Sequence, residues 1–209
     1  MHKVVIAVTL LSALSAGINC VHAASTNDKI LIAYFSYAEN AELPQGIDAM
    51  TSASVQYFNG ELTGNTGVVA RLIQQHTGAD LFSIRTENKY PPTYDETLEV
   101  GEREHDEDAR PEMISKITDL DSYDTVFIGF PNWYYDMPMV MYSFFDEYDF
   151  SGKKIIPFNT SGGARFSSTI NTIRQLEPNA VVTEGLSINY SRLDEAPLRV
   201  EEFLKTFDY

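Results

Sequence analysis

The hydrophobic positions of this chain form short uninterrupted runs that alternate with segments of helical spacing. Five runs have the length and apolar character of buried strands, at residues 29–35, 79–85, 125–130, 154–158 and 180–184. Helical spacing occupies the intervals, at residues 64–78, within 93–118, at 136–148, at 165–176 and near 200–207. Strands that are apolar throughout and that alternate with helices indicate parallel βαβ units. We therefore expect one α/β domain, residues 24–209, with five parallel strands and helices on both faces.

The helix predicted at 64–78 begins directly after the run Thr63-Gly64-Asn65-Thr66-Gly67. The first turn of a helix leaves backbone N–H groups without partners at the positive end of the helix dipole. Two glycines and three short polar side chains would let a phosphate approach these groups closely. The same residues also suit an ordinary N-cap, because Asn and Thr are favoured there. This stretch alone does not separate the two interpretations.

Two further loops follow predicted strands at the edge of the sheet where α/β proteins bind ligands. The loop "PNWYYDMP" begins at Pro131 and places the only tryptophan of the chain, Trp133, beside two tyrosines. Such aromatic residues suit a flat ligand ring, although core packing or a partner contact would also use them. The loop "NTSGGARF" offers hydroxyls and flexible amides from Thr160 to Gly163. Taken together, the three loops predict a nucleotide-like cofactor with a phosphate tail and an aromatic head.

The N-terminal residues have the pattern of a secretory signal peptide. A short positive region precedes an apolar run, and Val21-His22-Ala23 is typical of a cleavage site, so we expect residues 1–23 to be removed. A buried N-terminal helix is a weaker interpretation, because no polar face interrupts the run. A lipid anchor at Cys20 is also ranked below the cleaved signal peptide, since the residues before it depart from a lipobox pattern. The protein is therefore expected to be exported, periplasmic or secreted, with no stable membrane span after cleavage.

The composition also excludes several kinds of partner and of catalytic site. The net charge is −15, which argues against nucleic acid or an anionic membrane as a partner. Cys20 is the only cysteine, so the processed chain would have no thiol or disulfide. His76 and His105 are expected on the surface. The sequence pattern identifies no residue as a metal ligand or as a catalytic acid or base. Any chemistry is therefore expected to come from a cofactor.

The segments "AYFS…TGNT", "GFPNWYYDMP" and "FNTSGGARF" resemble the flavodoxin-like FMN-binding proteins over about residues 28–207. The resemblance implies a doubly wound sheet of order 2-1-3-4-5, and FMN as the cofactor. It assigns the FMN phosphate to the first loop, the isoalloxazine ring to the second and the pyrimidine edge of the ring to the third. The implied contacts are Ser36, Thr63, Gly64, Asn65 and Thr66, then Pro131, Asn132, Trp133 and Tyr134, and finally Thr160, Ser161, Gly162 and Gly163.

The chain departs from the family pattern within the phosphate loop. The family places its serine two residues before Thr-Gly-Asn-Thr, whereas here residues 37–62 intervene. We interpret this stretch as an insertion that ends in a hairpin turned at Asn59-Gly60. The contact expected from Ser36 depends on that residue folding back beside Thr66.

The function implied by the resemblance is electron transfer, or reduction of a small acceptor, by a bound flavin. The partner would be a redox protein or a small electron acceptor, and the acidic surface would favour a basic protein. Two alternatives stay open. One is an FMN-dependent enzyme, an NAD(P)H-dependent quinone or flavin reductase, and the other is a flavin-free binding module on the same fold.

Overall fold

The structure of the protein is a computed structural model that describes residues 29–43 and 55–207. The proposed signal peptide and Cys20 lie outside the described residues. The strands are β1 (Ile30–Tyr34), β2 (Gln56–Phe58), β3 (Glu61–Thr63), β4 (Asp80–Ser83), β5 (Thr125–Pro131), β6 (Lys154–Ser161), β7 (Val181–Val182) and β8 (Leu186–Asn189). The α-helices are α1 (Tyr37–Asn40), α2 (Asn65–Thr77), α3 (Tyr94–Asp106), α4 (Met139–Glu147), α5 (Thr169–Leu176) and α6 (Ala196–Leu204). Two 3₁₀ helices, η1 (Leu120–Ser122) and η2 (Tyr190–Glu195), complete the described elements.

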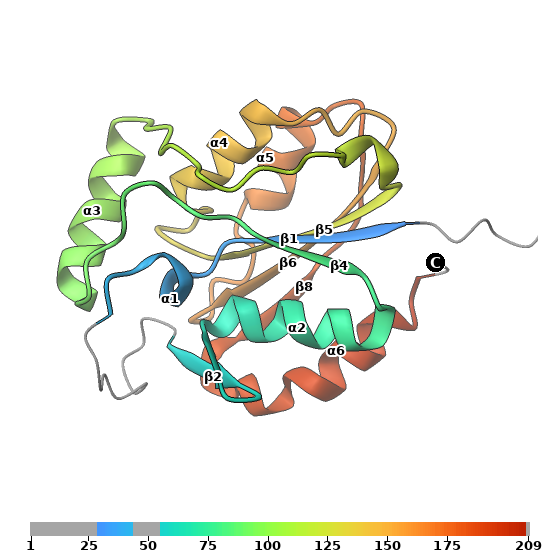
Figure 1. Ribbon diagram of the computed structural model, residues 1–209, viewed down its shortest axis with the longest axis horizontal. Coiled ribbons are helices and arrows are strands. Elements are labelled where there is room, and N and C mark those ends of the chain that lie inside the picture. The colour runs from blue at the N-terminus through green and yellow to red at the C-terminus, as the bar shows by residue number, and fades with distance from the viewer. Residues whose placement is uncertain (1–28, 44–54, 208–209) are drawn as a thin grey trace, which may run out of the picture.

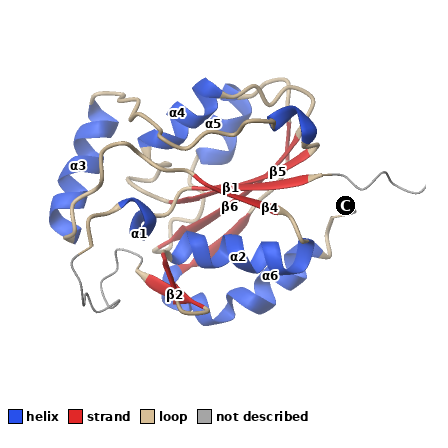
Figure 2. Cartoon of the chain, in the orientation of Figure 1, coloured by secondary structure: helices blue, strands red, loops and turns tan. Residues whose placement is uncertain are grey.

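The central sheet is parallel and runs in the order β4-β1-β5-β6-β7, with β8 also paired to β6. Leaving aside the separate hairpin of β2 and β3, this is the order 2-1-3-4-5 expected from the sequence. Figure 2 shows the strands as a central layer between helices. The predicted fold class is therefore confirmed.

The two faces of the sheet bury two separate hydrophobic clusters. Alternate residues of a strand point to opposite faces, and β1 follows this rule. Leu31 and Ala33 pack in the cluster that contains the apolar residues of α4, whereas Ile30 and Ile32 pack with those of α2 and α6. Figure 1 shows α2 and α6 together on one side of the sheet and α4 and α5 on the other. Both faces are covered, which explains the continuous apolar strands of the sequence.

The fifth strand is interrupted, where the sequence predicted one continuous strand at 180–184. Lys154 of β6 pairs with Val181, but pairing resumes only between Phe158 and Leu186. The gap lies opposite Pro157, which has no N–H to donate to a neighbouring strand. Proline in a paired strand therefore divides the fifth strand into β7 and β8.

Three helix boundaries differ from the sequence prediction. The acidic helix α3 ends at Asp106 and so occupies only the first part of the 93–118 interval. Helix α5 begins at Thr169 rather than at 165. Helix α4 begins at Met139 rather than at 136, with Pro138 as its N-cap, and the Asp136 carboxylate instead accepts hydrogen bonds from Met137 N and the Tyr142 hydroxyl, both at 2.8 Å. The expected end of α2 is confirmed by Gly78, whose φ of 68° is left-handed.

The hairpin expected at the end of residues 37–62 is confirmed. Strands β2 and β3 pair antiparallel, and the turn residues Asn59 and Gly60 have φ angles of 51° and 85°. Two central residues with positive φ define the type I′ turn that Asn-Gly favours. The described part of residues 37–62 also includes α1, which the sequence pattern did not predict. In Figure 1, α1, β2 and α3 gather near the end of the sheet at which β1 terminates.

Replacing Gly129 with alanine is expected to lower the free energy of unfolding by about 1–3 kcal/mol through overpacking. A Cβ at this position would lie 2.0 Å from the ring of Phe158, which is fully buried on the neighbouring strand and cannot move aside. Urea denaturation measures the change. Adding Phe158→Leu should recover part of the loss, since the two side chains share one space. Strictly additive effects would show that the collision does not determine the stability at this position.

None of the helices within residues 29–43 and 55–207 combines the length and the apolar character needed to cross a membrane.

Candidate cofactor site

A cavity of about 240 Å³ opens where the strands of the sheet end. This volume is slightly below the range of roughly 300–1,000 Å³ typical of small-molecule pockets. Its walls come from the ends of β5 and β6, from the start of α2 and from α3. The lining residues are Tyr37, Asn65, Tyr94, Thr97, Leu98, Pro131, Asn132, Trp133, Tyr134, Thr160, Ser161, Gly162 and Tyr190. Most of the wall is aromatic or apolar, with a few hydroxyl and amide groups, as in sites for flat ligands.

One wall of the cavity is a tight turn after β5. Trp133 and Asp136 exchange two backbone hydrogen bonds of 2.8 Å, and the residues between them, Tyr134 and Tyr135, have φ angles of 52° and 64°. Positive φ is sparsely populated by residues other than glycine and is often found at functional sites. The turn is anchored to α3, because the Tyr134 hydroxyl donates to the Leu98 carbonyl at 2.6 Å. The backbone of this loop is thus held in an unfavourable conformation that displays aromatic rings.

Trp133 has two sets of neighbours. It lines the cavity, and its ring also packs edge to face against Phe35 and Tyr90, with centroid distances of 5.6 and 5.2 Å. The sequence offered ligand stacking and core packing as alternatives for this residue. The structure places Trp133 at the boundary between the hydrophobic core and the cavity, so that it is half-buried and contacts both.

The opposite wall is the loop after β6. The Ser161 hydroxyl accepts a hydrogen bond from the Arg165 backbone at 3.0 Å, which holds the loop closed. Gly162 packs against Tyr190, and a Cβ on Gly162 would lie 2.8 Å from the Tyr190 hydroxyl. A larger residue at 162 would therefore push Tyr190 or the loop itself out of place. Gly163, also predicted to contact the ligand, does not line this cavity.

The start of α2 has the features expected of an anion site. Its N-cap is Gly64, no side chain caps the first turn, and no acidic residue lies there. Asn65 reaches the cavity, and its Oδ1 accepts a hydrogen bond of 2.9 Å from Gln56 of the hairpin. The hydroxyls of Thr66 and Thr160 are 2.8 Å apart, so that the helix start is joined to the loop after β6. Within residues 29–43 and 55–207, no side chain is bonded to the first-turn N–H groups, and Asn65 of this turn lines the cavity.

Ser36 follows β1 and has a buried hydroxyl without a described partner. The residue is 1% exposed, and its Oγ makes no hydrogen bond within the part of the chain that the structure describes. Buried polar groups are usually hydrogen-bonded, and an exception calls for an explanation. An anion bound between the end of β1 and the start of α2 would supply the missing acceptor. The phosphate contact expected of Ser36 stays a prediction.

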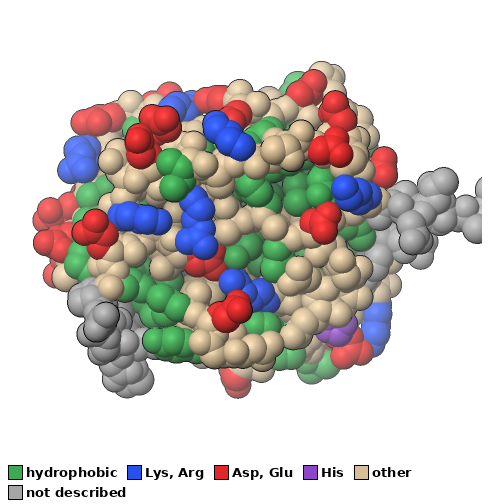
Figure 3. All heavy atoms as spheres, in the orientation of Figure 1, with side chains coloured by type: hydrophobic (Ala, Val, Ile, Leu, Met, Phe, Trp, Pro, Cys, Tyr) green, Lys and Arg blue, Asp and Glu red, His purple; other side chains and the backbone are tan. Residues whose placement is uncertain are grey.

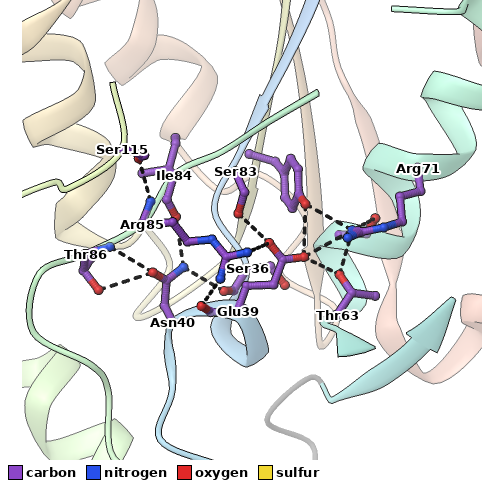
Figure 4. Close-up of polar contacts among 12 residues, drawn as sticks. Ser36, Glu39, Asn40, Thr63, Arg71, Ser83, Ile84, Arg85, Thr86 and Ser115 are labelled. Atoms are coloured by element: carbon purple, nitrogen blue, oxygen red, sulfur yellow. Dashed lines mark hydrogen bonds and ion pairs between the residues drawn. The ribbon is translucent and has the colours of Figure 1, made fainter. Parts of the chain in front are cut away.

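A buried carboxylate, Glu39, lies at the centre of a polar network beside the helix start (Figure 4). Its side chain is 3% exposed and forms ion pairs with Arg71 at 3.2 Å and Arg85 at 3.3 Å. It also accepts hydrogen bonds from the hydroxyls of Tyr34, Thr63 and Ser83, at 3.0, 2.5 and 2.5 Å. Burial, together with the Glu39 charge, raises the pKa of Tyr34 to about 12. Glu39, which lies in α1, thus supplies the negative charge that pairs with two arginines of the domain.

The network reaches the phosphate loop through Thr63 and Gly67. The Thr63 hydroxyl donates to Glu39 and accepts a hydrogen bond of 2.9 Å from Arg71, so that this side chain is directed into the network and away from the cavity. Arg71 also donates to the Gly67 carbonyl at 3.2 Å. A Cβ on Gly67 would lie 2.0 Å from the Thr63 hydroxyl, so only glycine leaves room for these contacts.

The structure therefore brings most of the predicted site residues to one place. Asn65, Pro131, Asn132, Trp133, Tyr134, Thr160, Ser161 and Gly162 line the cavity. Thr63, Gly64 and Thr66 lie at or next to the helix start without lining the cavity, and Ser36 is buried after β1, outside the cavity lining.

The sequence reasoning missed two groups of residues. One is the network of Glu39, Arg71 and Arg85, and the other consists of the cavity residues Tyr37, Tyr94, Thr97, Leu98 and Tyr190. Tyr190 could have been found, because it follows the interrupted fifth strand, whose carboxyl end reaches the same edge of the sheet. The α3 residues carried no such signal, because nothing in the sequence placed that helix against the cavity.

Neither of the two histidines of the described residues lines the cavity. His76 and His105 are exposed, as expected. Within residues 29–43 and 55–207, no group of three His, Cys, Asp or Glu side chains has the arrangement of a metal site.

Solved structures share this fold. A flavoprotein structure from Bacteroides eggerthii has a TM-score of 0.63 and 22% sequence identity, covering 86% of this chain and 98% of that one. One from Bacteroides uniformis has a TM-score of 0.63 and 24% identity, covering 83% and 98%. A flavoprotein from Lactobacillus acidophilus, solved in complex with FMN, has a TM-score of 0.57 and 17% identity, covering 80% and 97%. Because the sequence identities are this low, the similarity to these structures establishes a shared fold and nothing more.

The relatives found by sequence comparison are flavodoxins. The flavodoxin of Haemophilus influenzae is 28% identical over 142 residues, which cover 64% of this chain and 67% of the relative. Flavodoxin 1 of Escherichia coli K12 is 26% identical over 137 residues, covering 61% and 64%. The chain thus spans about two thirds of the length of these relatives. The family model described as Flavodoxin matches residues 52–203, which include α2 and both loops of the cavity. The chain belongs to the flavodoxin family.

Proposed function

We propose that this protein binds FMN and acts in electron transfer. The observation that carries the proposal is the meeting of two features at one edge of the sheet. The uncapped start of α2 suits a phosphate, and Asn65 in its first turn lines the aromatic cavity between Trp133 and Tyr190. Family membership and the FMN complex of the Lactobacillus acidophilus protein support FMN as the cofactor.

Each part of the site has a distinct role in this proposal. The N–H groups of the first α2 turn and the hydroxyls of Ser36 and Thr66 hold the phosphate. Trp133 and Tyr134 flank the ring, and residues 160–162 meet its polar edge. FMN, when bound, supplies one- and two-electron chemistry. The aromatic walls exclude water, which disfavours additional negative charge on the ring and so favours a low reduction potential.

The partner is proposed to be a redox protein or a small electron acceptor. The net charge of −15 would steer a basic protein toward this chain over distances of about one Debye length, roughly 8–10 Å at physiological salt. Figure 3 shows acidic and basic side chains interspersed on the viewed face, so steering would arise from the net charge and not from a uniformly acidic face there. Rapid bleaching of the yellow protein by NADH or NADPH would instead identify a reductase.

The protein is also proposed to be exported, since residues 1–23 have the pattern of a signal peptide. Mass spectrometry of the protein recovered outside the cytoplasm tests this, and a processed chain beginning at Ala24 is expected. An intact N-terminus would contradict cleavage, and a lipid-modified Cys20 would identify the anchored alternative.

Replacing Asn65 with leucine is expected to weaken FMN binding by about 1–3 kcal/mol, because a polar group close to the phosphate is lost. Riboflavin, which has no phosphate, is expected to bind the variant about as well as the parent. Flavin fluorescence titration measures both affinities. The change also removes the hydrogen bond from Gln56, so Gln56→Leu is the matched control that removes only that bond. A parallel loss of riboflavin affinity would show that Asn65 does not act on the phosphate.

A further inference from the structure

A second cavity, of about 250 Å³, adjoins the proposed flavin site and shares Ser161 with it. Three arginines and a single glutamate line this cavity, in a chain with 15 basic and 30 acidic residues. The other lining residues are Gly163, Ser187, Ile188 and Asn189. The local charge is therefore opposite in sign to that of the whole protein. We name this cavity the arginine pocket.

The arginine pocket is built on a fixed backbone. Arg165 has a φ angle of 53°, which is unfavourable for a residue other than glycine. Its carbonyl accepts hydrogen bonds from the side-chain amides of Asn132 at 3.0 Å and Asn159 at 2.6 Å, and its N–H donates to Ser161 at 3.0 Å. These three bonds hold Arg165 in the same loop that forms one wall of the flavin cavity.

The charges of the arginine pocket are only partly compensated. Arg192 forms an ion pair with Glu195. Within residues 29–43 and 55–207, the guanidinium groups of Arg165 and Arg199 make no hydrogen bond or ion pair. A guanidinium presents several donors in one plane, which match the oxygen atoms of a phosphate or a carboxylate. Two such groups without partners around one depression leave donors available to an oxyanion.

We propose that the arginine pocket binds the oxyanion group, phosphate or carboxylate, of a small molecule that lies beside the flavin. That this molecule lies next to the flavin ring rests on the proposed function. The oxyanion site itself does not depend on it. Electron donors or acceptors with such a group would then be selected over neutral ones. The volume of the depression suits a small molecule, and the net charge of the chain would repel an acidic protein or a nucleic acid. That repulsion is screened beyond about 10 Å, so a small anion near the arginines meets mainly their positive charge.

The test is an NMR titration of the FMN-loaded protein, in which the proposed phosphate site on α2 is already occupied. Inorganic phosphate and succinate are added separately at constant ionic strength, with potassium chloride as the reference. The backbone amides of Gly163 and Ser187 report on the arginine pocket. A saturable shift is expected with at least one of the two anions, and the comparison shows whether phosphate or carboxylate is preferred. Shifts that do not saturate, or that chloride reproduces, would overturn the proposal.

Variants connect the binding to the arginines. The double change Arg165→Gln with Arg199→Gln is expected to weaken anion binding at least tenfold while leaving FMN affinity within about twofold of the parent. Arg174→Gln, which changes an exposed arginine outside the pocket, is the matched control and should change neither value. Equal anion affinities in the parent and the double variant would refute the site. If the protein does not take up FMN, the same titration of the flavin-free chain decides, because amide shifts at Thr66 separate anion binding at α2 from binding at Gly163.

Discussion

Replacing Glu39 with alanine is expected to lower the free energy of unfolding by about 3 kcal/mol, the lower end of the range for breaking a buried ion pair. The Arg71 side chain, 16% exposed, would keep a charge without its partner. Arg85, 37% exposed, can reach water, which limits the loss. The hydroxyls of Thr63 and Ser83 would lose their acceptor as well. Urea denaturation of the flavin-free protein measures this effect.

The same substitution is expected to affect FMN more than riboflavin. Glu39 holds Thr63 and Arg71, and Arg71 holds the Gly67 carbonyl, so the network supports the backbone that would face the phosphate. Glu42→Ala is the matched control, because it removes an exposed acidic side chain from the same segment and should change stability by less than about 0.5 kcal/mol. If Glu39→Ala resembles Glu42→Ala in stability, the arginines do not depend on this carboxylate.

Replacing Trp133 with alanine is expected to reduce both flavin affinity and stability. Loss of ring contact should weaken FMN and riboflavin equally, by about 1 kcal/mol or more. Loss of the contacts with Phe35 and Tyr90 should also destabilise the fold, by less than the 3–5 kcal/mol typical of fully buried tryptophans, since Trp133 is half-buried. Flavin titration and urea denaturation separate the two effects.

Fluorescence provides an independent measurement of the same residue. Trp133 is the only tryptophan, so its emission reports on this loop, and bound FMN is expected to quench it strongly. Tyr135→Ala is the control from the same turn, because that side chain is 74% exposed and does not line the cavity. Unquenched emission from a fully yellow sample would assign Trp133 to the core alone, and the flanking role would pass to Tyr134.

Much of the fold could be predicted because it depends on local patterns. Continuous apolar runs identified the strands, and helical spacing identified α2. The pair Asn59-Gly60 identified the hairpin of β2 and β3. The three loops of the site could be predicted because α/β proteins bind ligands at the carboxyl ends of their parallel strands. Pro157 was also a local signal, because it lies in an apolar run and cannot donate to a neighbouring strand, but its effect on the fifth strand was not anticipated.

The features that were missed depend on contacts between distant parts of the chain. From the sequence, Glu39 would be expected on the surface, because carboxylates are seldom buried unless they are paired. Its partners, Arg71 and Arg85, lie 32 and 46 residues away along the chain. Nothing in the sequence indicated that α1 would place a carboxylate between them. The position of α3 against the cavity is likewise a tertiary contact, which Tyr134 makes through the Leu98 carbonyl.

We expect the interrupted fifth strand to limit aggregation of the protein at high concentration. A long flat strand at the edge of a sheet offers unpaired N–H and C=O groups to a second molecule and so promotes aggregation. Here that edge is divided into Val181–Val182 and Leu186–Asn189, because Pro157 breaks the ladder between them. Neither piece is long enough to form an extended intermolecular sheet. The proline that shortens the strand is therefore also expected to protect this edge from intermolecular pairing.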